Sequence, residues 1–234
     1  MRRGRTKHTP HSKRFSELNT KIDKTKTYSI EEAIKLAKET ATTKFDSSIE
    51  LSVRTGIDPA KSEQQIRSVV LLPHGTGKKI KIAVVAPPDK QKEAKAAGAD
   101  IVGGLEMIDE IAKTKKIGFD ILVTLPEMMK DLGKIAKILG PKGLMPNPKT
   151  ETVTTNLKKT VEELAKGKVS FKNDDTGNLH LSIGKASFED QKLIDNYKAF
   201  MEALNRVKPT SIKGIFLKNV VISSTMGPGI KVQI

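Results

Sequence analysis

The spacing of apolar residues changes twice along this chain, and no other feature of the sequence constrains the fold as much. Residues 49–54 alternate apolar and polar side chains, as a strand with one wet face does. From residue 80 to residue 166, short apolar runs alternate with helical patterns, which is typical of βαβ units around a mostly parallel sheet covered on both faces. After residue 167 the alternating pattern returns. The simplest topology therefore inserts a middle α/β unit into a loop of an outer unit.

The pattern also predicts individual elements, and the fold class it predicts is α/β. In the outer unit we expect strands at 49–54, 66–72, 168–172, 179–183 and 215–223, helices at 29–37 and 188–207, and a hairpin turn at 174–178. In the middle unit we expect strands at 80–86, 99–103 and 119–124, and helices at 94–97, 105–112, 128–139 and 156–166.

Three glycines mark the two places where the chain crosses between these units. Gly75 and Gly77 lie in a turn before residue 80, and Gly167 follows the last helix of the middle unit. Glycine is favoured where the backbone changes direction, and a two-strand crossing permits relative motion of the parts. We therefore predict a hinge at these glycines, between domains at 28–75 plus 168–234 and at 76–167, preceded by a basic arm at 1–27.

The composition restricts the partners of the protein to polyanions. The 234 residues carry a formal net charge of +15 with a pI near 9.8, which favours nucleic acid or an anionic membrane. No apolar run reaches about 18 residues, so we expect no membrane span, and the basic start lacks the apolar stretch of a secretory signal. Cysteine and Trp are absent and Tyr occurs twice, which argues against disulfides, thiolate metal sites and broad base-stacking platforms. Structured nucleic acid is the remaining partner class.

The excess positive charge is concentrated at the start of the sequence. Residues 1–27 contain nine Lys and Arg against two acids, which is almost half of the net charge, and they are poor in large apolar residues. A segment of this composition is mobile alone and becomes ordered on a partner. The alternative interpretation is a solubilising tail.

Motifs for catalysis or cofactor binding are incomplete. The run Gly75-Thr76-Gly77-Lys78 lacks the full spacing of a phosphate-binding loop, and the glycines between residues 97 and 104 do not form a Gly-x-Gly-x-x-Gly fingerprint. The four histidines are scattered without metal-ligand spacing. We expect no enzyme activity, no cofactor and no metal.

Three segments have the chemistry of binding loops. Residues 140–149 hold three prolines, two glycines and two lysines, so they form a rigid basic loop rather than a helix or central strand. Residues 223–229 follow a strand with hydroxyls and free backbone N–H groups that suit phosphates and 2′-hydroxyls, although a plain strand end explains them equally well. Phe45 is either a core residue or a lone stacking ring.

Six segments together resemble a known family. They are residues 44–46 (Lys-Phe-Asp), 56–59 (Gly-Ile-Asp-Pro), 72–78 (Leu-Pro-His-Gly-Thr-Gly-Lys), 97–100 (Ala-Gly-Ala-Asp), 139–149 (Leu-Gly-Pro-Lys-Gly-Leu-Met-Pro-Asn-Pro-Lys) and 224–228 (Ser-Thr-Met-Gly-Pro), in that order. From about Tyr28 to Val232 the chain resembles the bacterial-type L-one family of large-subunit ribosomal proteins. The segment before Tyr28 matches less well.

The resemblance implies both a fold and a function. The outer domain has an antiparallel sheet with helices in a split βαβ arrangement, and the inserted domain is a Rossmann-like three-layer α/β domain. By this resemblance we expect a cytoplasmic, non-enzymatic constituent of the large subunit that binds the rRNA of the mobile stalk near the tRNA exit site. The resemblance also implies that the protein assists release of deacylated tRNA and represses its own messenger RNA by binding an rRNA-like site. We expect a monomer when the protein is free.

The resemblance also implies site residues. Phe45, Thr225, Met226 and Gly227 match the RNA-contacting face of the family. On charge and strand position we add a second set: Lys44, Lys172, His180, Lys185, Lys218, Ser223 and Ser224. The loop at 140–149 is then a rigid structural element of the inserted domain, with a secondary contact to RNA or tRNA through Lys142 and Lys149.

Overall fold

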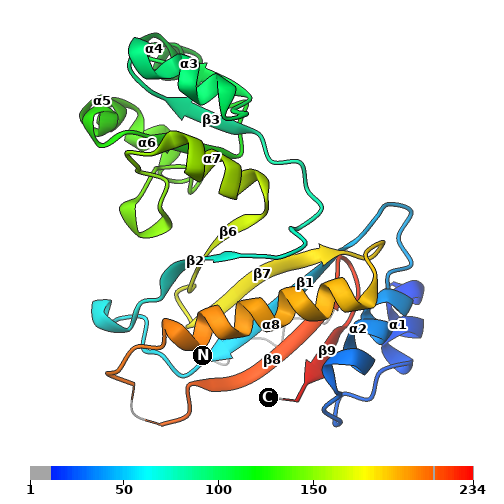
Figure 1. Cartoon of the computed structure of the whole chain (residues 1–234). Coiled ribbons are helices and arrows are strands. Elements are labelled where there is room, and N and C mark those ends of the chain that lie inside the picture. Colours follow the sequence, from blue (N-terminus) through cyan, green and yellow to red (C-terminus); the bar gives the residue numbers. More distant parts are fainter. Residues whose placement is uncertain (1–11, 213, 234) are drawn as a thin grey trace, which may run out of the picture.

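The strands that the structure describes form three sheets (Figure 1). The computed structural model describes residues 12–212 and 214–233. An antiparallel sheet has the strand order β7 (Asn178–Lys185), β1 (Ser48–Thr55), β8 (Leu217–Ser224), β9 (Gly229–Val232). A ribbon pairs β2 (Arg67–Leu71) with β6 (Lys168–Lys172). A parallel sheet has the order β4 (Ile101–Gly103), β3 (Ile82–Val85), β5 (Ile121–Thr124).

The sheets and helices divide between two regions of the chain. The outer region is residues 12–75 and 168–233; its helices are α1 (Lys13–Thr20), α2 (Ile30–Glu39) and α8 (Asp190–Arg206), with the short turn η1 (Ser62–Gln64). The middle region is residues 76–167; its helices are α3 (Pro88–Ala96), α4 (Leu105–Thr114), α5 (Met129–Leu132), α6 (Ala136–Leu139) and α7 (Leu157–Ala165).

The antiparallel sheet of the outer region is covered by helices on one face. Along β1, Ile49, Leu51 and Val53 are buried in a core that also contains residues of α2 and α8, while the residues between them are exposed or partly exposed. Both β7 and β8 pair antiparallel with β1, so they run parallel to each other, and α8 connects them. This is a split βαβ unit, and it confirms the predicted fold class.

The helices of the outer region form where the sequence predicts them. Ser29 and Glu32 form a reciprocal capping box at the start of α2, which satisfies two backbone donors that a helix end leaves free. In α8, residues such as Phe200 and Leu204 face the core, and the Phe200 ring meets Phe171 of β6 edge to face at 5.2 Å. This contact ties the helix to the two-stranded ribbon.

The parallel sheet of the middle region is covered on both faces, as its continuous apolar runs predict. Ala83 and Val85 belong to a core cluster with α4, α5 and α6, whereas Ile82 and Val84 belong to a second cluster with α3 and α7. All four residues of β3 are buried. A three-layer α/β arrangement results.

The predicted hairpin at residues 174–178 is wrong in its strand pairing. The turn exists, closed by a bridge between Asn173 and Leu179 and by the Asp174 N–H, which donates to the Asn178 carbonyl at 2.9 Å. Beyond the turn, however, β6 pairs with β2 and β7 pairs with β1. The sequence marks a turn by its Asp and Gly residues, but it does not state which strand becomes the hydrogen-bonding partner on either side.

Two predicted helices of the middle region have different limits. The helix expected at 128–139 is broken into α5 and α6 by 3-10 turns at Pro126–Met128 and Gly133–Ile135. Gly133 is a weak helix former and permits the change of pitch. The helix expected at 94–97 begins earlier, at Pro88, because a proline is tolerated in the first turn of a helix.

Two elements were not predicted. Helix α1 is capped by Ser12, and the side chains of Leu18 and Ile22 are buried, so residues 12–27 differ from the partner-dependent arm expected there. Residues 1–11 of that arm lie outside the described residues. Strand β9 follows the turn at 225–228 and pairs with β8. Its four residues are too few for a clear alternating pattern.

Candidate nucleic-acid interface

The face of the antiparallel sheet opposite the helices is polar. Side chains alternate across a strand, so the residues between the buried positions of β1, β7, β8 and β9 share this second face. Ser52 lies opposite His180 in the register, and the Ser52 Oγ and His180 Nδ1 atoms are 3.1 Å apart. The face combines hydroxyls, two cations, an imidazole, an amide, one carboxylate and one half-buried apolar residue: Glu50, Ser52, Arg54, His180, Ser182, Asn219, Val221, Ser223 and Lys231. Such groups suit RNA phosphates and 2′-hydroxyls.

At one end of this sheet, three segments are tied together by Ser48, the first residue of β1. The backbone N–H of Thr225 donates to the Ser48 carbonyl at 2.9 Å, and the Ser48 N–H donates to Thr225 Oγ1 at 3.1 Å. The ammonium of Lys185, at the end of β7, donates to Ser48 Oγ at 3.0 Å. The predicted residues Lys185 and Thr225 therefore lie together.

Two large apolar side chains extend into solvent at this same end. Phe45, in the loop before β1, is 56% exposed, and Met226, in the turn between β8 and β9, is 67% exposed. The exposure excludes the core alternative for Phe45. The loop is fixed by Asp46, whose carboxylate accepts hydrogen bonds from the N–H and hydroxyl of Ser187 at 3.2 and 2.8 Å. The predicted Lys44 is exposed beside Phe45.

The turn that carries Met226 depends on its neighbours. The N–H of Gly227 donates to the Ser224 carbonyl at 2.8 Å, and a Cβ at Gly227 would collide with the Ser224 side chain. Ser224 is 2% exposed, and its hydroxyl lies 3.4 Å from the hydroxyl of Thr40. Ser224 therefore supports the turn from inside rather than facing a ligand, in contrast to the prediction made for it.

Two predicted residues lie away from this end. Lys218 is near the start of β8, six residues before Ser224, which corresponds to about 20 Å along a strand. Lys172 ends β6, where it faces Arg67 of β2 in the register. No described ion pair or hydrogen bond engages either cation of that cross-strand pair. The predicted set thus divides into a cluster at the Phe45–Met226 end and separate cations elsewhere.

The turn at 174–178 reaches the polar face near His180. Hydrogen bonds from the Asn178 N–H and from Thr176 hold the pKa of the Asp174 carboxyl well below its ordinary value. The Asp174 carboxylate lies 3.8 Å from His180 Nε2. A carboxylate that stays ionised beside the imidazole makes this end of the face less positive than the Phe45–Met226 end.

Sequence reasoning missed several residues of the interface. Ser52 and Arg54 carried a usable signal, because the alternation along residues 49–54 already assigns them to the wet face. The contacts of Asp46 and Arg14 carried no signal, since they join residues 141 and 212 positions apart, although Asp46 belongs to the Lys-Phe-Asp segment of the family resemblance.

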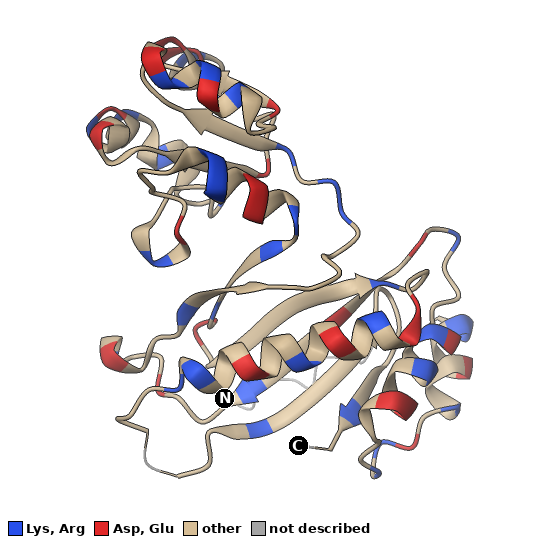
Figure 2. Ribbon diagram, viewed as in Figure 1, with Lys and Arg blue, Asp and Glu red and all other residues tan. Residues whose placement is uncertain are grey.

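The predicted hinge glycines are grouped at the junction of the two regions. Gly75, Gly77 and Gly167 have φ angles of +63°, +71° and +108°, and a Cβ on Gly167 would lie 2.5 Å from the Gly75 Cα. Asn196 of α8, which is fully buried, holds this crossing by donating to the Gly75 carbonyl at 2.9 Å and accepting from the His74 N–H at 3.1 Å. Figure 2 shows basic residues along both connecting segments.

An ion-pair cluster around the buried Lys168 lies just beyond the crossing. The Lys168 ammonium contacts the carboxylates of Glu151 and Glu163, the latter at 2.7 Å. Burial opposes the charge of Lys168, but hydrogen bonds to the two carboxylates outweigh it and raise the pKa of the ammonium. The same hydrogen bond lowers the pKa of Glu163.

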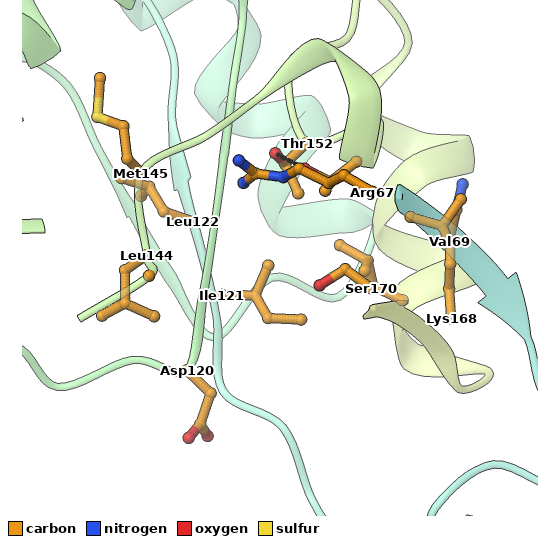
Figure 3. A pocket seen from close by; sticks show the side chains of 13 residues that line it. Arg67, Val69, Asp120, Ile121, Leu122, Leu144, Met145, Thr152, Lys168 and Ser170 are labelled. Carbon is orange, nitrogen blue, oxygen red and sulfur yellow. Dashed lines mark hydrogen bonds between the residues drawn. The ribbon is translucent and has the colours of Figure 1, made fainter. Parts of the chain in front are cut away.

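The proline-rich loop at 140–149 forms one wall of a cleft whose other wall is the β2–β6 ribbon (Figure 3). Leu144 and Met145 line the loop side, and the Arg67 side chain extends across from β2 toward Thr152. Hydrogen bonds hold the loop, because the Asn147 N–H donates to Thr152 Oγ1 at 2.8 Å and the Lys149 N–H donates to Asn147 Oδ1 at 2.8 Å. The loop contacts the ribbon and lies apart from Phe45 and Met226.

Comparison with known proteins decides the family. The model of the Ribosomal protein L1p/L10e family matches residues 37–228. The chain belongs to this family. Proteins named "Large ribosomal subunit protein uL1" are similar over nearly their whole length. The one from Thermosipho africanus (strain TCF52B) is 51% identical over 223 residues (95% of this chain and 96% of the relative), and the one from Mycoplasma capricolum subsp. capricolum (strain California kid) is 54% identical over 222 residues (95% and 98%).

Membership of the Ribosomal protein L1p/L10e family confirms the predicted resemblance and the non-enzymatic class. The matched range includes Phe45, the proline-rich loop and the Thr225–Gly227 turn. Within residues 12–212 and 214–233, no three His, Asp or Glu side chains are grouped as a metal site would need, and none of the helices described there has the length and apolar character to cross a membrane.

Proposed function

We propose that this protein is a structural component of the large ribosomal subunit that grips the rRNA of the mobile stalk with the outer region. One observation carries the proposal. Two large apolar side chains, Phe45 and Met226, extend into solvent side by side with an open polar sheet face, in a protein of net charge +15. Exposed apolar side chains beside cations and hydroxyls suit stacking on bases or sugars of a folded RNA.

Each part of the surface has a distinct role in this mechanism. Lys44 and Lys185 neutralise phosphates, which gives affinity that falls steeply with salt. Phe45 and Met226 press against bases or sugars, while the Thr225 hydroxyl, engaged with Ser48, holds the turn in place. Other polar groups of the open face, including the Ser223 hydroxyl and the His180 imidazole, extend the contact. Lys172 and Lys218 act as peripheral phosphate contacts.

We further propose that residues 28–75 plus 168–234 and residues 76–167 are separate domains that move about Gly75, Gly77 and Gly167. The close approach of two glycine backbones supports a narrow crossing, and separate core clusters on either side support independent bodies. An inserted domain that swings with the stalk would act on deacylated tRNA near the exit site, with Lys142 and Lys149 exposed for that contact.

Repression of the protein's own messenger RNA would use the same surface. An RNA that reproduces the stalk fold presents the same phosphates, sugars and bases to Phe45 and Met226. The messenger RNA would therefore bind the same site as the stalk rRNA, and no second site is needed. A messenger segment that competes with stalk RNA for the protein would support it.

The test is an RNA-binding titration with the variants Met226→Ala and Thr225→Ala. Each should weaken binding to a stalk fragment of the large-subunit rRNA by about 1–3 kcal/mol, and should weaken binding to an unrelated RNA duplex of equal length much less. Leu105→Ala, which removes a 51% exposed side chain in the middle region, is the matched control. Equal losses for both RNAs would reduce the turn to a source of general affinity, and wild-type binding by both variants would exclude this surface.

A further inference from the structure

One arginine links the two loops that carry Phe45 and Met226. The Arg14 guanidinium donates through Nη2 to the Met226 carbonyl at 2.9 Å and through Nη1 to the Thr42 hydroxyl at 3.2 Å. Thr42 lies three residues before Phe45. None of the ion pairs between described residues includes Arg14, so a carboxylate does not account for the orientation of its side chain.

The arginine is presented by an anchored helix. Helix α1 is capped by the Ser12 side chain, which accepts from the Phe15 N–H at 3.3 Å. Its far end is fixed by the buried side chains of Leu18 and Ile22. Arg14 itself is half-buried. The guanidinium therefore approaches the two loops from a backbone that is itself held in place.

The peptide group that Arg14 contacts needs such support. Met226 has φ +63°, the left-handed region that side-chain-bearing residues seldom adopt. Its side chain is mostly in solvent, so packing does not fix the conformation. Two hydrogen bonds hold it instead: the Gly227 N–H to the Ser224 carbonyl, and the Arg14 guanidinium to the Met226 carbonyl. Without the second bond, the peptide between Met226 and Gly227 keeps only the hydrogen bond from the Gly227 N–H.

We propose that Arg14 is a positioning residue for RNA recognition, which fixes the Met226 peptide relative to the Phe45 loop. The inference rests on the proposed function, because it assigns a purpose to the geometry of that same surface. The planar guanidinium offers separate donors to two acceptors in a fixed geometry, which a lysine ammonium on a flexible stem does not reproduce.

The experiment compares Arg14→Gln and Arg14→Lys with Lys13→Gln in the full chain. Lys13 is exposed on the same helix and has no described contact with either loop, so its variant removes the same charge without the link. Binding to the stalk fragment of the large-subunit rRNA and to an unrelated RNA duplex is measured between about 50 and 300 mM salt, the range over which phosphate contacts are weakened. Amide exchange of Gly227 in the free protein gives a readout independent of RNA.

We expect Arg14→Gln to weaken binding of stalk RNA about tenfold, as loss of one specific contact does. The salt dependence of binding should stay as in wild type, and the affinity for the unrelated duplex should change little. Arg14→Lys should lose a similar amount, and Gly227 exchange should accelerate in both variants. Lys13→Gln should change neither stalk selectivity nor the exchange of Gly227.

Three outcomes would overturn the inference. Arg14→Gln could bind stalk RNA as wild type does, or Arg14→Lys could keep full affinity. Arg14→Gln could also lose the same affinity for both RNAs, with a salt slope reduced by about one, which indicates a direct phosphate contact. Failure of the proposed function is distinguishable, because the wild-type protein would then show no preference for stalk RNA.

Discussion

The two large sheets of the molecule differ in how many faces are covered. In the outer region, helices cover one face of the antiparallel sheet, and the other face has hydroxyls, cations and, at one end, exposed apolar side chains. In the middle region, helices cover both faces of the parallel sheet, and β3 is buried along its whole length. Parallel strands need crossover helices, and these occupy the faces; antiparallel strands leave a face free.

The comparison teaches where each region can bind a partner. A sheet covered on both faces can offer only loops, such as the proline-rich loop at 140–149, and this loop already contacts the β2–β6 ribbon. An open sheet offers a broad surface of regularly spaced side chains, which suits an extended RNA. This division can be tested by changing each region in turn.

Phe200→Ala in α8 and Leu132→Ala in the middle region both remove a side chain that is at most 1% exposed. Each should reduce the free energy of unfolding by about 2–5 kcal/mol because it leaves a cavity. In urea titrations with and without stalk RNA, we expect RNA to stabilise the transition shifted by Phe200→Ala and not the one shifted by Leu132→Ala. A single transition moved equally by both variants would contradict two independent regions.

Lys168→Ala tests the ion-pair cluster beside the crossing. It should reduce the free energy of unfolding at pH 7 by about 1–2 kcal/mol, since Glu163 loses a charged hydrogen-bond partner. The lowered pKa of Glu163 makes its contribution complete above the ordinary value of 4.5 and lost as the pH falls through the lowered value. The free energies of unfolding of wild type and Lys168→Ala should therefore approach each other in acid.

Urea denaturation at pH 7 and at pH 3 measures this difference, with Lys159→Ala as the control because Lys159 is 75% exposed and 3.9 Å from Glu163. The raised pKa of Lys168 predicts a second loss of stability at high pH. Stability from the ammonium is complete below its ordinary pKa of 10.5 and falls as the pH rises through the raised value. A difference that persists unchanged from pH 7 to pH 3 would exclude Glu163 as the partner.

Lys185→Ala and Lys142→Ala remove the same charge from the two regions. Lys185→Ala should weaken binding of stalk RNA about fivefold, because Lys185 lies beside Ser48 and the Met226 turn. Lys142→Ala should weaken it less than about twofold, because charges beyond about 10 Å are screened at 0.1 M salt. Filter-binding titrations at that salt concentration compare them. Equal losses would assign the proline-rich loop to the primary interface.

Replacement of residues 76–167 by a short linker should also have only a small effect on RNA affinity. Gly75 and Gly167 are adjacent in space, and the Leu72 N–H donates to the Gly167 carbonyl at 3.2 Å, so a few residues can close the gap to Lys168. We expect a folded protein, checked by circular dichroism, whose affinity in a gel-shift assay lies within about threefold of wild type, an energy below that of one specific contact. Loss of most affinity would place essential contacts in the middle region.

Particular residues show how far prediction from sequence reached. The Ser29–Glu32 cap, the alternation along β1 and the continuous apolar run of β3 are local patterns, and they gave the elements and the fold class. Phe45 and the Thr225–Gly227 turn came from the resemblance to a family. The pairing of β6 with β2 was missed, because a strand pattern does not name its partner.

Which strands have a free face can be read from the sequence, because periodicity is set by side chains one or two residues apart. Three relations required the folded protein: Ser224 is buried beneath the turn, Lys172 and Lys218 lie far from Met226, and Arg14 joins two loops. These relations depend on contacts between residues distant in the chain, which form when strands acquire neighbours and helices cover a face. Local chemistry sets the elements of this protein, and long-range packing sets the site.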